Sequence, residues 1–432
     1  MNTTPKGNRL HIGIFGRTNV GKSSLMNFIV GQDIAITSPV AGTTTDIVEK
    51  AAELLPLGPV LFLDTAGLDD TSILSDQRIK KTQKIYERAD VILLVTEPEI
   101  WTDYEEAVLK EAGKRTIPIL IVINKIDLQK PSEDFIRQLR KRSERVIPLS
   151  SVDWEEKDRS VELLKRHLIE VSPDDFIQTP SLIGDLLPPG GFAVLVVPID
   201  LQAPKGRLIL PQVQTIRDAL DCDASVLIVK ERELSPSLAT MNRLPDIVVC
   251  DSQAILKVSA NVPSSVPCTT FSILFARQKG DIVGAAAGIT WIEELLPGDK
   301  ILIAEACSHH PLQDDIGRVK IPRWLRQYVG ADIQTDVSTG RDCPDNLNDY
   351  KLIIHCGACM LTRREMLNRI QKAKEAGAPI TNYGIAISFL QGVIRRTLSP
   401  FPPASYAYEK RMEAIKRARG SGGEMIHEND GK

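Results

Sequence analysis

The chain has 432 residues and lacks the features that mark several large classes of protein. No apolar run reaches the roughly 18 residues that a membrane-spanning helix needs, so we expect no membrane segment. The formal net charge is −3 and aromatic residues make up only 5% of the chain, which argues against a surface that binds nucleic acid. An apolar strand already begins at Leu10, so we expect no secretory leader and a cytoplasmic location.

Cysteine is missing from the first half of the chain. The first of the seven cysteines is Cys222, and in a reducing compartment the seven do not form a disulfide framework. Clustered cysteines in a cytoplasmic protein instead indicate metal binding or catalysis. Hydrophobic residues make up 43% of the chain and charged residues 25%, as in ordinary globular proteins, and the length allows about two to four domains.

The hydrophobic pattern predicts an α/β protein of three domains. Apolar runs at residues 60–63, 91–95 and 119–123 alternate with amphipathic stretches, as expected for a P-loop domain with a mostly parallel sheet. We expect this domain at residues 1–172, followed by a linker that ends at Pro188-Pro189-Gly190-Gly191. Two smaller α/β domains are expected at residues 180–265 and 266–400, and a C-terminal segment at 401–432 whose tail we expect to be disordered.

The second predicted domain is small. It offers strands at residues 193–199, 225–229 and 246–250 and a helix near 213–220, which is little for an independent core. We therefore expect it to pack against another surface, most simply a copy of itself in a homodimer. In the third domain, Thr362 and Glu365 form a capping-box pattern that predicts a helix ending near Gly377.

Residues 16–23 read Gly-Arg-Thr-Asn-Val-Gly-Lys-Ser, directly after a predicted strand and before a predicted helix. In this context the pattern indicates a phosphate-binding loop. Its backbone N–H groups hold the phosphates, and we assign Gly16, Gly21 and Ser24 to the nucleotide contact. Lys22 is expected to reach the β- and γ-phosphates and Ser23 to bind magnesium.

Three further motifs end predicted strands. Asp64 can hold magnesium through water, and the Gly67 N–H can contact the γ-phosphate. In Asn124-Lys125-Ile126-Asp127 the carboxylate of Asp127 can accept both N–H donors of guanine, a pair that adenine lacks, so we expect GTP and GDP as ligands. Ser150 and Ser151 stand where a loop backs the base.

These motifs resemble the GTPase class that includes the tRNA-modifying and ribosome-assembly GTPases, over residues 9–170. The segment 42–46 resembles its first switch, which implies that Thr44 contacts magnesium, and Asn19 matches the asparagine with which this class holds a potassium ion. Leu68 stands where other GTPases carry a water-orienting Gln, so we expect slow hydrolysis. The other candidates for positioning water are Asp69, Asp70, Asp76 and Gln77.

Two cysteine motifs also follow predicted strands. Cys307-Ser308-His309 comes after the strand at 301–304, and His355-Cys356-Gly357-Ala358-Cys359 after the strand at 352–354. Ligands collect at the carboxyl ends of parallel strands, so adjacent strands would bring the motifs together, and the helix that follows is expected to lower the thiol pKa. Three thiolates can bind a 4Fe-4S cluster with one iron left open, or a zinc ion together with His309, His310 or His355. We interpret the remaining cysteines as core or loop residues, namely Cys222, Cys250, Cys268 and Cys343.

The combination of motifs resembles the FeFe-hydrogenase maturation GTPase (HydF) family along nearly the whole chain, including the segment 203–212. The resemblance implies a dimeric scaffold and carrier. It would bind a 4Fe-4S cluster, receive a transient di-iron precursor built by two radical-SAM enzymes, and deliver it to apo FeFe-hydrogenase. Without the resemblance, the residues indicate only a GTPase with a three-cysteine metal site. The alternative function is an RNA- or ribosome-directed GTPase with a structural zinc site.

Overall fold

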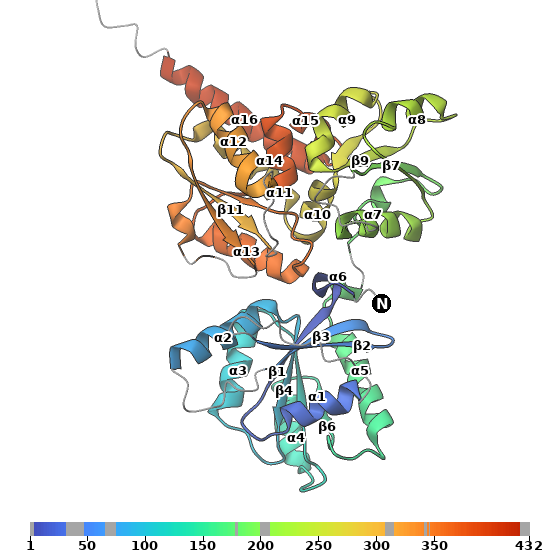
Figure 1. The fold of residues 1–432 in the computed structure, drawn as a ribbon. Helices are drawn as coiled ribbons and strands as arrows, with labels where there is room; N and C mark the ends of the chain where they lie inside the picture. Colours follow the sequence, from blue (N-terminus) through green and yellow to red (C-terminus); the bar gives the residue numbers. More distant parts are fainter. Residues whose placement is uncertain are drawn as a thin grey trace, which may run out of the picture. The chain divides into compact units, whose positions relative to one another are not determined.

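The computed structural model describes residues 4–31, 47–64, 75–177, 180–198, 208–306, 315–340, 344 and 346–423. The chain divides into two compact units, residues 1–179 and 180–432 (Figure 1). Each unit is an α/β structure, and each of the three sheets is built mainly or wholly from parallel strand pairs. Within the described ranges, no helix has both the length and the apolarity that crossing a membrane requires.

The first unit contains one six-stranded sheet in the order β2-β3-β1-β4-β5-β6, in which only the β2–β3 pair is antiparallel. This confirms the predicted P-loop domain with a mostly parallel sheet. The strands are β1 Leu10–Phe15, β2 Val48–Leu54, β3 Gly58–Asp64, β4 Val91–Thr96, β5 Ile119–Ile123 and β6 Val146–Pro148. The helices are α1 Lys22–Val30, α2 Ser75–Arg88, α3 Asp103–Lys114, α4 Glu133–Arg140, α5 Lys157–Val171 and α6 Asp174–Ile177.

Helices cover both faces of this sheet, which explains the continuous apolar runs (Figure 1). On one face α1 and α5 contribute Leu25 and Leu164 to the core, and on the other α2 and α3 contribute Ile85 and Val108. All residues of β1 and β4 are buried. Because the central strands are parallel, their carboxyl ends meet at one edge, and the loops that leave this edge lie close together.

The second unit contains two four-stranded sheets in which every strand pair is parallel. The first has the order β10-β9-β7-β8, with β7 Phe192–Val196, β8 Ser225–Val229, β9 Ile247–Cys250 and β10 Cys268–Thr270. The second has the order β12-β11-β13-β14, with β11 Lys300–Glu305, β12 Gln334–Thr339, β13 Leu352–His355 and β14 Ile380–Asn382. The predicted strands are thus present, and β10 extends the first sheet beyond the expected boundary at residue 265.

Ten α-helices accompany these two sheets in the described part of the second unit. They are α7 Leu210–Asp221, α8 Leu234–Thr240, α9 Ile255–Asn261, α10 Phe271–Lys279, α11 Ile282–Gly288, α12 Ile321–Val329, α13 Arg363–Glu375, α14 Tyr383–Leu390, α15 Ile394–Leu398 and α16 Pro402–Gly423. A short 3₁₀ helix, η4, spans Ile289–Glu294, and a π-helical turn spans Ile316–Lys320.

One hydrophobic core runs through both sheets of the second unit. Val194 and Val248 of the first sheet belong to the same buried cluster as Ile301 and Ile354 of the second. The small core of residues 180–265 is therefore completed by the rest of the same chain. The small size of this core is then no argument for packing against a second copy of the protein. Helix α16 adds Tyr408 to this cluster, so the C-terminal segment begins as part of the fold.

The expected linker is structured in its second half. Leu182 and Ile183 are buried, and the backbone N–H groups of Leu182, Ile183 and Gly184 donate to one oxygen of Asp218 at 3.0, 2.8 and 2.8 Å. A carboxylate that accepts three backbone N–H groups holds a segment firmly. The chain therefore joins the second unit at residue 180. The Pro, Gly and polar residues of this segment predict a linker. The sequence does not reveal that Asp218, more than 30 residues away, accepts their backbone N–H groups.

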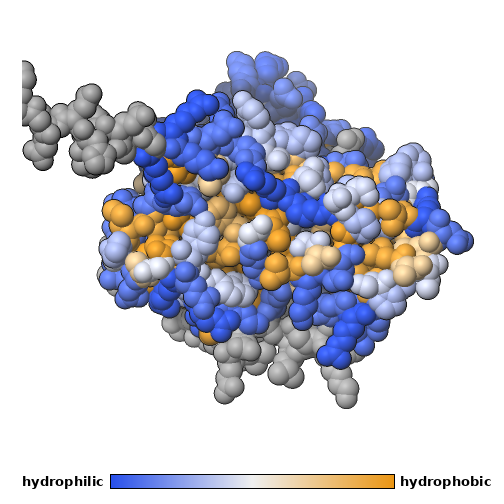
Figure 2. All heavy atoms as spheres, turned by 90° about the horizontal axis from the view of Figure 1, so that it is seen from above, coloured by the Kyte–Doolittle hydropathy of each residue, from blue (hydrophilic) through white to orange (hydrophobic). Residues whose placement is uncertain are grey.

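Apolar side chains also lie on the outer surface of the second unit. Figure 2 shows them interspersed with hydrophilic residues across one face of the molecule. Exposed apolar residues of the first sheet and its helices include Leu220 and Ile228, of which Ile228 is 43% exposed on β8. Among the described strands β8 lies at the edge of its sheet, so it combines a backbone edge that no described strand pairs with and an exposed apolar side chain.

Candidate functional site

The phosphate-loop motif lies between β1 and α1, at the edge where the central strands end. Two of its positions require glycine, because neighbouring atoms lie too close for a side chain. A Cβ on Gly16 would lie 2.5 Å from the Val95 carbonyl oxygen, and a Cβ on Gly21 would lie 2.3 Å from Nδ2 of Asn124. Gly21 also has φ +93°, and it is the N-cap of α1. The loop therefore fits closely against β4 and against the predicted base-binding segment.

The side chains of the loop are placed for binding an anion. The Lys22 ammonium is buried and donates to the carbonyl oxygens of Gly16 and Arg17 at 2.6 and 3.0 Å, so it lies within the loop. Ser23 and Ser24 are exposed in the first turn of α1, where the N–H groups of a helix start and the helix dipole favour phosphate. Asn19 is exposed with φ +65°, a left-handed conformation that Asn tolerates.

The predicted base-binding residues meet beside the phosphate loop. Asn124 is fully buried; its amide donates to the Val20 carbonyl at 2.8 Å and accepts from the Ser151 N–H at 3.0 Å. The Ser150 hydroxyl donates to Asp127 at 2.5 Å, which orients a carboxylate that remains exposed. Asp64 ends β3 and is buried at the same edge. The structure thus brings together the predicted residues of β1, β3, β5 and β6.

Several predicted residues lie outside the described ranges. They include Thr44 of the first switch, Gly67 and Leu68 after β3, and Asp69 and Asp70. The side chains of Asp76 and Gln77 in α2 are also outside the description. The residue that positions the hydrolytic water therefore stays a prediction.

Sequence reasoning missed two acidic residues, Glu97 and Glu105, that pair with basic residues of the phosphate loop and the base-binding segment. Arg17 donates to Glu105 at 2.7 Å and lies 3.4 Å from Glu97, while Lys125 lies 2.6 Å from the other oxygen of Glu97. The Glu105 side chain has no exposed surface. Glu97 directly follows β4, so the rule that functional residues collect at carboxyl strand ends could have identified it.

The cysteine motifs follow two strands that are indeed adjacent. β11 pairs in parallel with β13, with Ala304 opposite His355. The Cys356 N–H donates to the Ala304 carbonyl at 2.9 Å, and the Ala306 N–H donates to Sγ of Cys356 at 3.2 Å. The residue just before Cys307 therefore contacts Cys356. Cys307, His309 and His310 themselves lie outside the described residues.

The loop that carries Cys356 and Cys359 is shaped by Ala358, which has φ +54° and is buried. Lys279 of α10 is buried beneath it and donates to the carbonyl oxygens of Leu361 and Cys359 at 2.6 and 3.3 Å. Both cysteines are partly buried and free of disulfides. No sequence spacing connects α10 with this loop, so Lys279 was not predicted.

The expected lowering of the thiol pKa is wrong for Cys359. Burial raises the pKa of the Cys359 thiol above its usual value, although the charge of Lys279 and two backbone N–H groups oppose the rise. The helix that follows is capped: Thr362 accepts from the Glu365 N–H at 3.2 Å and donates its own N–H to Glu365 at 2.8 Å. This capping box and helix α13 confirm the sequence prediction.

His355 is held on both sides of its ring. Its Nδ1 lies 2.8 Å from the Cys356 carbonyl, and its Nε2 lies 2.9 Å from Nη1 of Arg369. A guanidinium only donates, so Nε2 accepts, and Nδ1–H must donate to the carbonyl. Burial and the charge of Arg369 lower the pKa of His355 to about 3, which keeps this ring neutral. In this arrangement His355 braces Cys356 rather than presenting a nitrogen for a metal.

A carboxyl–phenol pair, Glu305 and Tyr383, lies near Cys356. Glu305, the last residue of β11, is buried and lies 3.4 Å from both the Tyr383 hydroxyl and the Arg318 guanidinium. Burial raises the pKa of Tyr383, and the nearby Cys356 and Glu305 raise it further. The Tyr383 hydroxyl therefore stays protonated close to the cysteine loop. Neither residue was predicted, although Glu305 precedes Cys307 by two positions.

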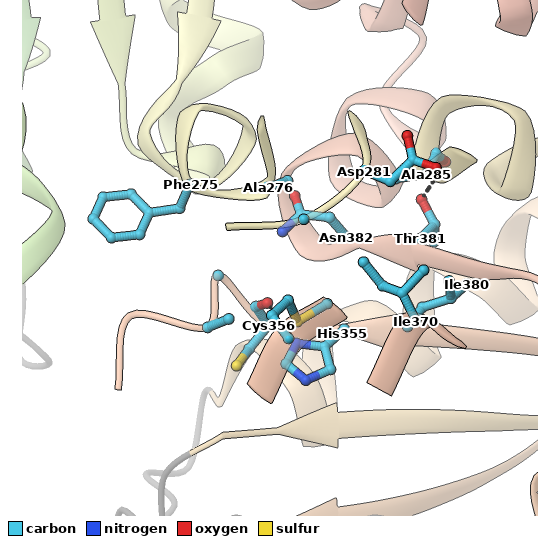
Figure 3. Close-up of a pocket in the computed structure, with 14 residues that line it drawn as sticks. Phe275, Ala276, Asp281, Ala285, His355, Cys356, Ile370, Ile380, Thr381 and Asn382 are labelled. Carbon is cyan, nitrogen blue, oxygen red and sulfur yellow. Dashed lines mark hydrogen bonds between the residues drawn. The ribbon is translucent and has the colours of Figure 1, made fainter. Parts of the chain in front are cut away.

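A pocket adjoins this loop between the second sheet and helices α10, α11 and α13 (Figure 3). Figure 3 shows His355 and Cys356 together near the pocket, and the Thr381 hydroxyl donating to the Ala285 carbonyl at 2.8 Å. Most other lining side chains are apolar, among them Phe275, Met366, Ile370 and Ile380. Among the described residues, no three His, Cys, Asp or Glu side chains are arranged to hold a metal ion. Cys307 is outside these residues.

The remaining cysteines are of two kinds. Cys250 and Cys268 are fully buried core residues on neighbouring strands β9 and β10, while Cys222 is partly buried after α7. Cys343 lies outside the described residues.

Comparisons with known proteins divide the chain in the same way. The model of the 50S ribosome-binding GTPase family matches residues 11–125. The tRNA modification GTPase MnmE of Prochlorococcus marinus is 44% identical over 121 residues, which is 28% of this chain and 26% of MnmE. GTPase Der of Wolinella succinogenes is 33% identical over 182 residues, 40% of this chain and 38% of Der. The chain thus spans well under half of the length of these relatives.

Among solved structures, Era of Aquifex aeolicus bound to GDP and AlF4− is 28% identical and covers 38% of this chain and 56% of Era. The TM-score of this comparison is 0.31. The second unit matches the models of two further domain families. The hydrogen maturase F dimerization domain matches residues 182–280, and the hydrogen maturase F tetramerization domain matches residues 284–400. The two matches adjoin each other and follow a GTPase domain, so the chain belongs to the hydrogen maturase F family, the GTPases of FeFe-hydrogenase maturation.

Proposed function

We propose that this protein is a GTP-hydrolysing scaffold that binds a 4Fe-4S cluster through Cys307, Cys356 and Cys359 and carries a di-iron precursor to apo FeFe-hydrogenase. The observation that carries the metal part is the contact between the Ala306 N–H and Sγ of Cys356, because it brings the chain leading into Cys307 to the Cys356–Cys359 loop. Family membership supports the carrier role. The two radical-SAM enzymes and the hydrogenase are partners that this family membership suggests.

The nucleotide site is suited to GTP and GDP with magnesium. Phosphates would contact the N–H groups of the loop and the Lys22 ammonium, and Ser23 and Thr44 would ligate magnesium, with Asp64 acting through water. Gly67 would contact the γ-phosphate. Potassium held by Asn19 could supply the positive charge that an arginine finger supplies in other GTPases. We expect slow hydrolysis, because Leu68 cannot orient water.

The donor set suits a cluster. Two partly buried thiols lie in one loop, an N–H already donates to Sγ of Cys356, and the buried Lys279 brings positive charge to the loop. N–H donors and positive charge stabilise thiolate sulfur. A cluster held by three thiolates leaves one iron for an exchangeable ligand or for the di-iron precursor. His309 and His355 are the candidate fourth ligands, and ligation by His355 would require its contact with Arg369 to break.

The matched domains support self-association, and we propose that a homodimer forms through β8, the edge strand of its sheet among the described residues. Two copies of this edge can pair across a two-fold axis and bury Ile228 together with neighbouring apolar residues. No nucleic-acid or membrane partner enters this proposal.

Base recognition is tested by Asp127→Asn. The change removes the charged acceptor for the guanine N–H donors, so the preference for GTP over ATP should fall by at least tenfold, about 1.4 kcal/mol. Competition binding measures the ratio of the two affinities, and Asp153→Asn in the nearby loop serves as control. An unchanged ratio would mean that Asp127 does not read the base.

The potassium role is tested by the rate of GTP hydrolysis in matched potassium and sodium salts. We expect faster hydrolysis in potassium, and Asn19→Ala should abolish the difference while GTP affinity changes little, because the side chain would hold the ion rather than the phosphates. Equal wild-type rates in the two salts would rule the role out.

Cluster binding is tested by replacing Cys307, Cys356 and Cys359 individually with Ala. Each change should lower iron and sulfide content after anaerobic reconstitution and abolish hydrogenase activation, whereas Cys222→Ala should leave both unchanged. Replacing His309 or His355 with Ala should change the paramagnetic resonance spectrum less than loss of a cysteine does, because solvent can replace a fourth ligand. Full iron content in all three cysteine variants would refute the ligand set, and one zinc per chain without sulfide would favour the structural-zinc alternative.

Dimerisation is tested by Ile228→Lys, which places a charge on the exposed edge of β8. The mass from light scattering should fall by about half, as expected when a β-edge contact is blocked. Leu55→Lys is the matched control, since Leu55 is 69% exposed in the first unit. If the Ile228 variant keeps the mass of the parent, the dimer contact lies elsewhere.

A further inference from the structure

The loop after β4 contacts both halves of the nucleotide site. In the sheet, β4 lies between β1, which leads into the phosphate loop, and β5, which leads into the base-binding segment. Glu97 is the first residue after β4 and therefore projects between the two loops. Its backbone is fixed there, because its carbonyl accepts from the Ile100 N–H at 3.2 Å and the Thr96 hydroxyl donates to the Ile100 carbonyl at 2.7 Å.

One carboxylate thus joins two cations from different loops. Oε1 of Glu97 lies 2.6 Å from Lys125 of the base-binding segment, and Oε2 lies 3.4 Å from Arg17 of the phosphate loop. The three side chains are largely shielded, with exposures of 22% for Glu97, 30% for Lys125 and 25% for Arg17. Shielding makes the two ion pairs worth more than fully exposed ones.

The phosphate-loop side of this link is anchored to α3. Arg17 also donates to Oε1 of the fully buried Glu105 at 2.7 Å. The second oxygen of Glu105 accepts from the N–H and the hydroxyl of Thr102 at 2.9 and 2.6 Å, which caps α3. In addition, the Gly16 N–H donates to the Tyr104 hydroxyl at 3.3 Å. The start of the phosphate loop is therefore held against the first turn of a helix, and Glu97 extends this support to the base side.

A guanine nucleotide bridges the same two loops, since its phosphates bind one and its base binds the other. Binding of the second half is then intramolecular, and its strength depends on whether the loops already have the right separation. We propose that Glu97 is a positioning residue that fixes the separation of the phosphate loop and the base-binding segment. This inference rests on the guanine-nucleotide site proposed above and adds a residue that touches neither base nor phosphate.

The test is Glu97→Gln, which keeps the size of the side chain and removes its charge. The affinity for GDP, measured by calorimetry, should fall about three- to tenfold, the range expected for loss of two shielded ion pairs. The affinities for guanosine and for magnesium pyrophosphate, each of which engages one loop, should change less than twofold. General damage to the fold would lower the affinities for GDP, guanosine and magnesium pyrophosphate together. The comparison of the three affinities therefore separates a positioning role from a structural one.

Glu106→Gln is the matched control, because Glu106 lies on α3 but pairs with Arg142 and Trp101 away from both loops. It should leave all three affinities unchanged. Glu97→Asp keeps the charge on a shorter side chain and should give an intermediate loss for GDP. A double-mutant cycle with Lys125→Met provides a second readout. If Glu97 acts through Lys125, Glu97→Gln should lower the GDP affinity much less in the Lys125→Met protein than in the wild type.

The outcomes are separable. Equal losses for GDP, guanosine and pyrophosphate, or full additivity with Lys125→Met, would overturn the positioning role while leaving the nucleotide site intact. If Glu97→Gln does not fold, the same comparison on Glu97→Asp decides, and an unchanged GDP affinity there overturns the proposal. A wild-type protein that fails to bind GDP would reject the nucleotide site itself.

Discussion

The parallel hydrogen-bond register between neighbouring strands is the constraint on which both candidate sites depend. In the first unit it aligns the carboxyl ends of β1, β3, β4 and β5, so that residues far apart in sequence meet at the proposed nucleotide site. In the second unit the single pairing of Ala304 with His355 sets the position of Cys356 against the chain that enters Cys307. A shift of one residue in this pairing would turn the side chains of β13 to the opposite face and break the site.

Charge is distributed differently around the two sites. At the nucleotide site, acidic residues hold the cations of the loops in place, and the bound phosphates would supply the remaining negative charge. At the cysteine loop, the buried cations Lys279 and Arg369 hold carbonyl oxygens and a neutral imidazole. Burial alone would favour protonated thiols there. At Cys359 the charge of Lys279 opposes this tendency.

Much of the fold and part of the candidate sites could be predicted from the sequence, because these features depend on residues that are close together in the chain. Strand runs such as 91–95, the phosphate loop and the Thr362–Glu365 capping box are determined by nearby residues. What could not be predicted depends on distant partners. Asp218 orders a segment that resembles a linker, Lys279 reaches the cysteine loop from another helix, and Arg369 occupies the His355 nitrogen that the sequence offered to a metal. The sign of the Cys359 pKa shift depends on burial, which spacing does not reveal.

The shared core of the second unit has a consequence for synthesis on the ribosome. Residues 1–179 contain a complete sheet with helices on both faces and can fold as soon as they emerge. The sheet of β7 to β10 is completed later, because helix α15 at Ile394–Leu398 packs against β10. Its parallel strands and apolar faces therefore stay incompletely covered until almost the whole chain has been made. During that interval the exposed strands and apolar faces are the part of the nascent chain most prone to aggregate, whereas the GTPase domain has already been completed.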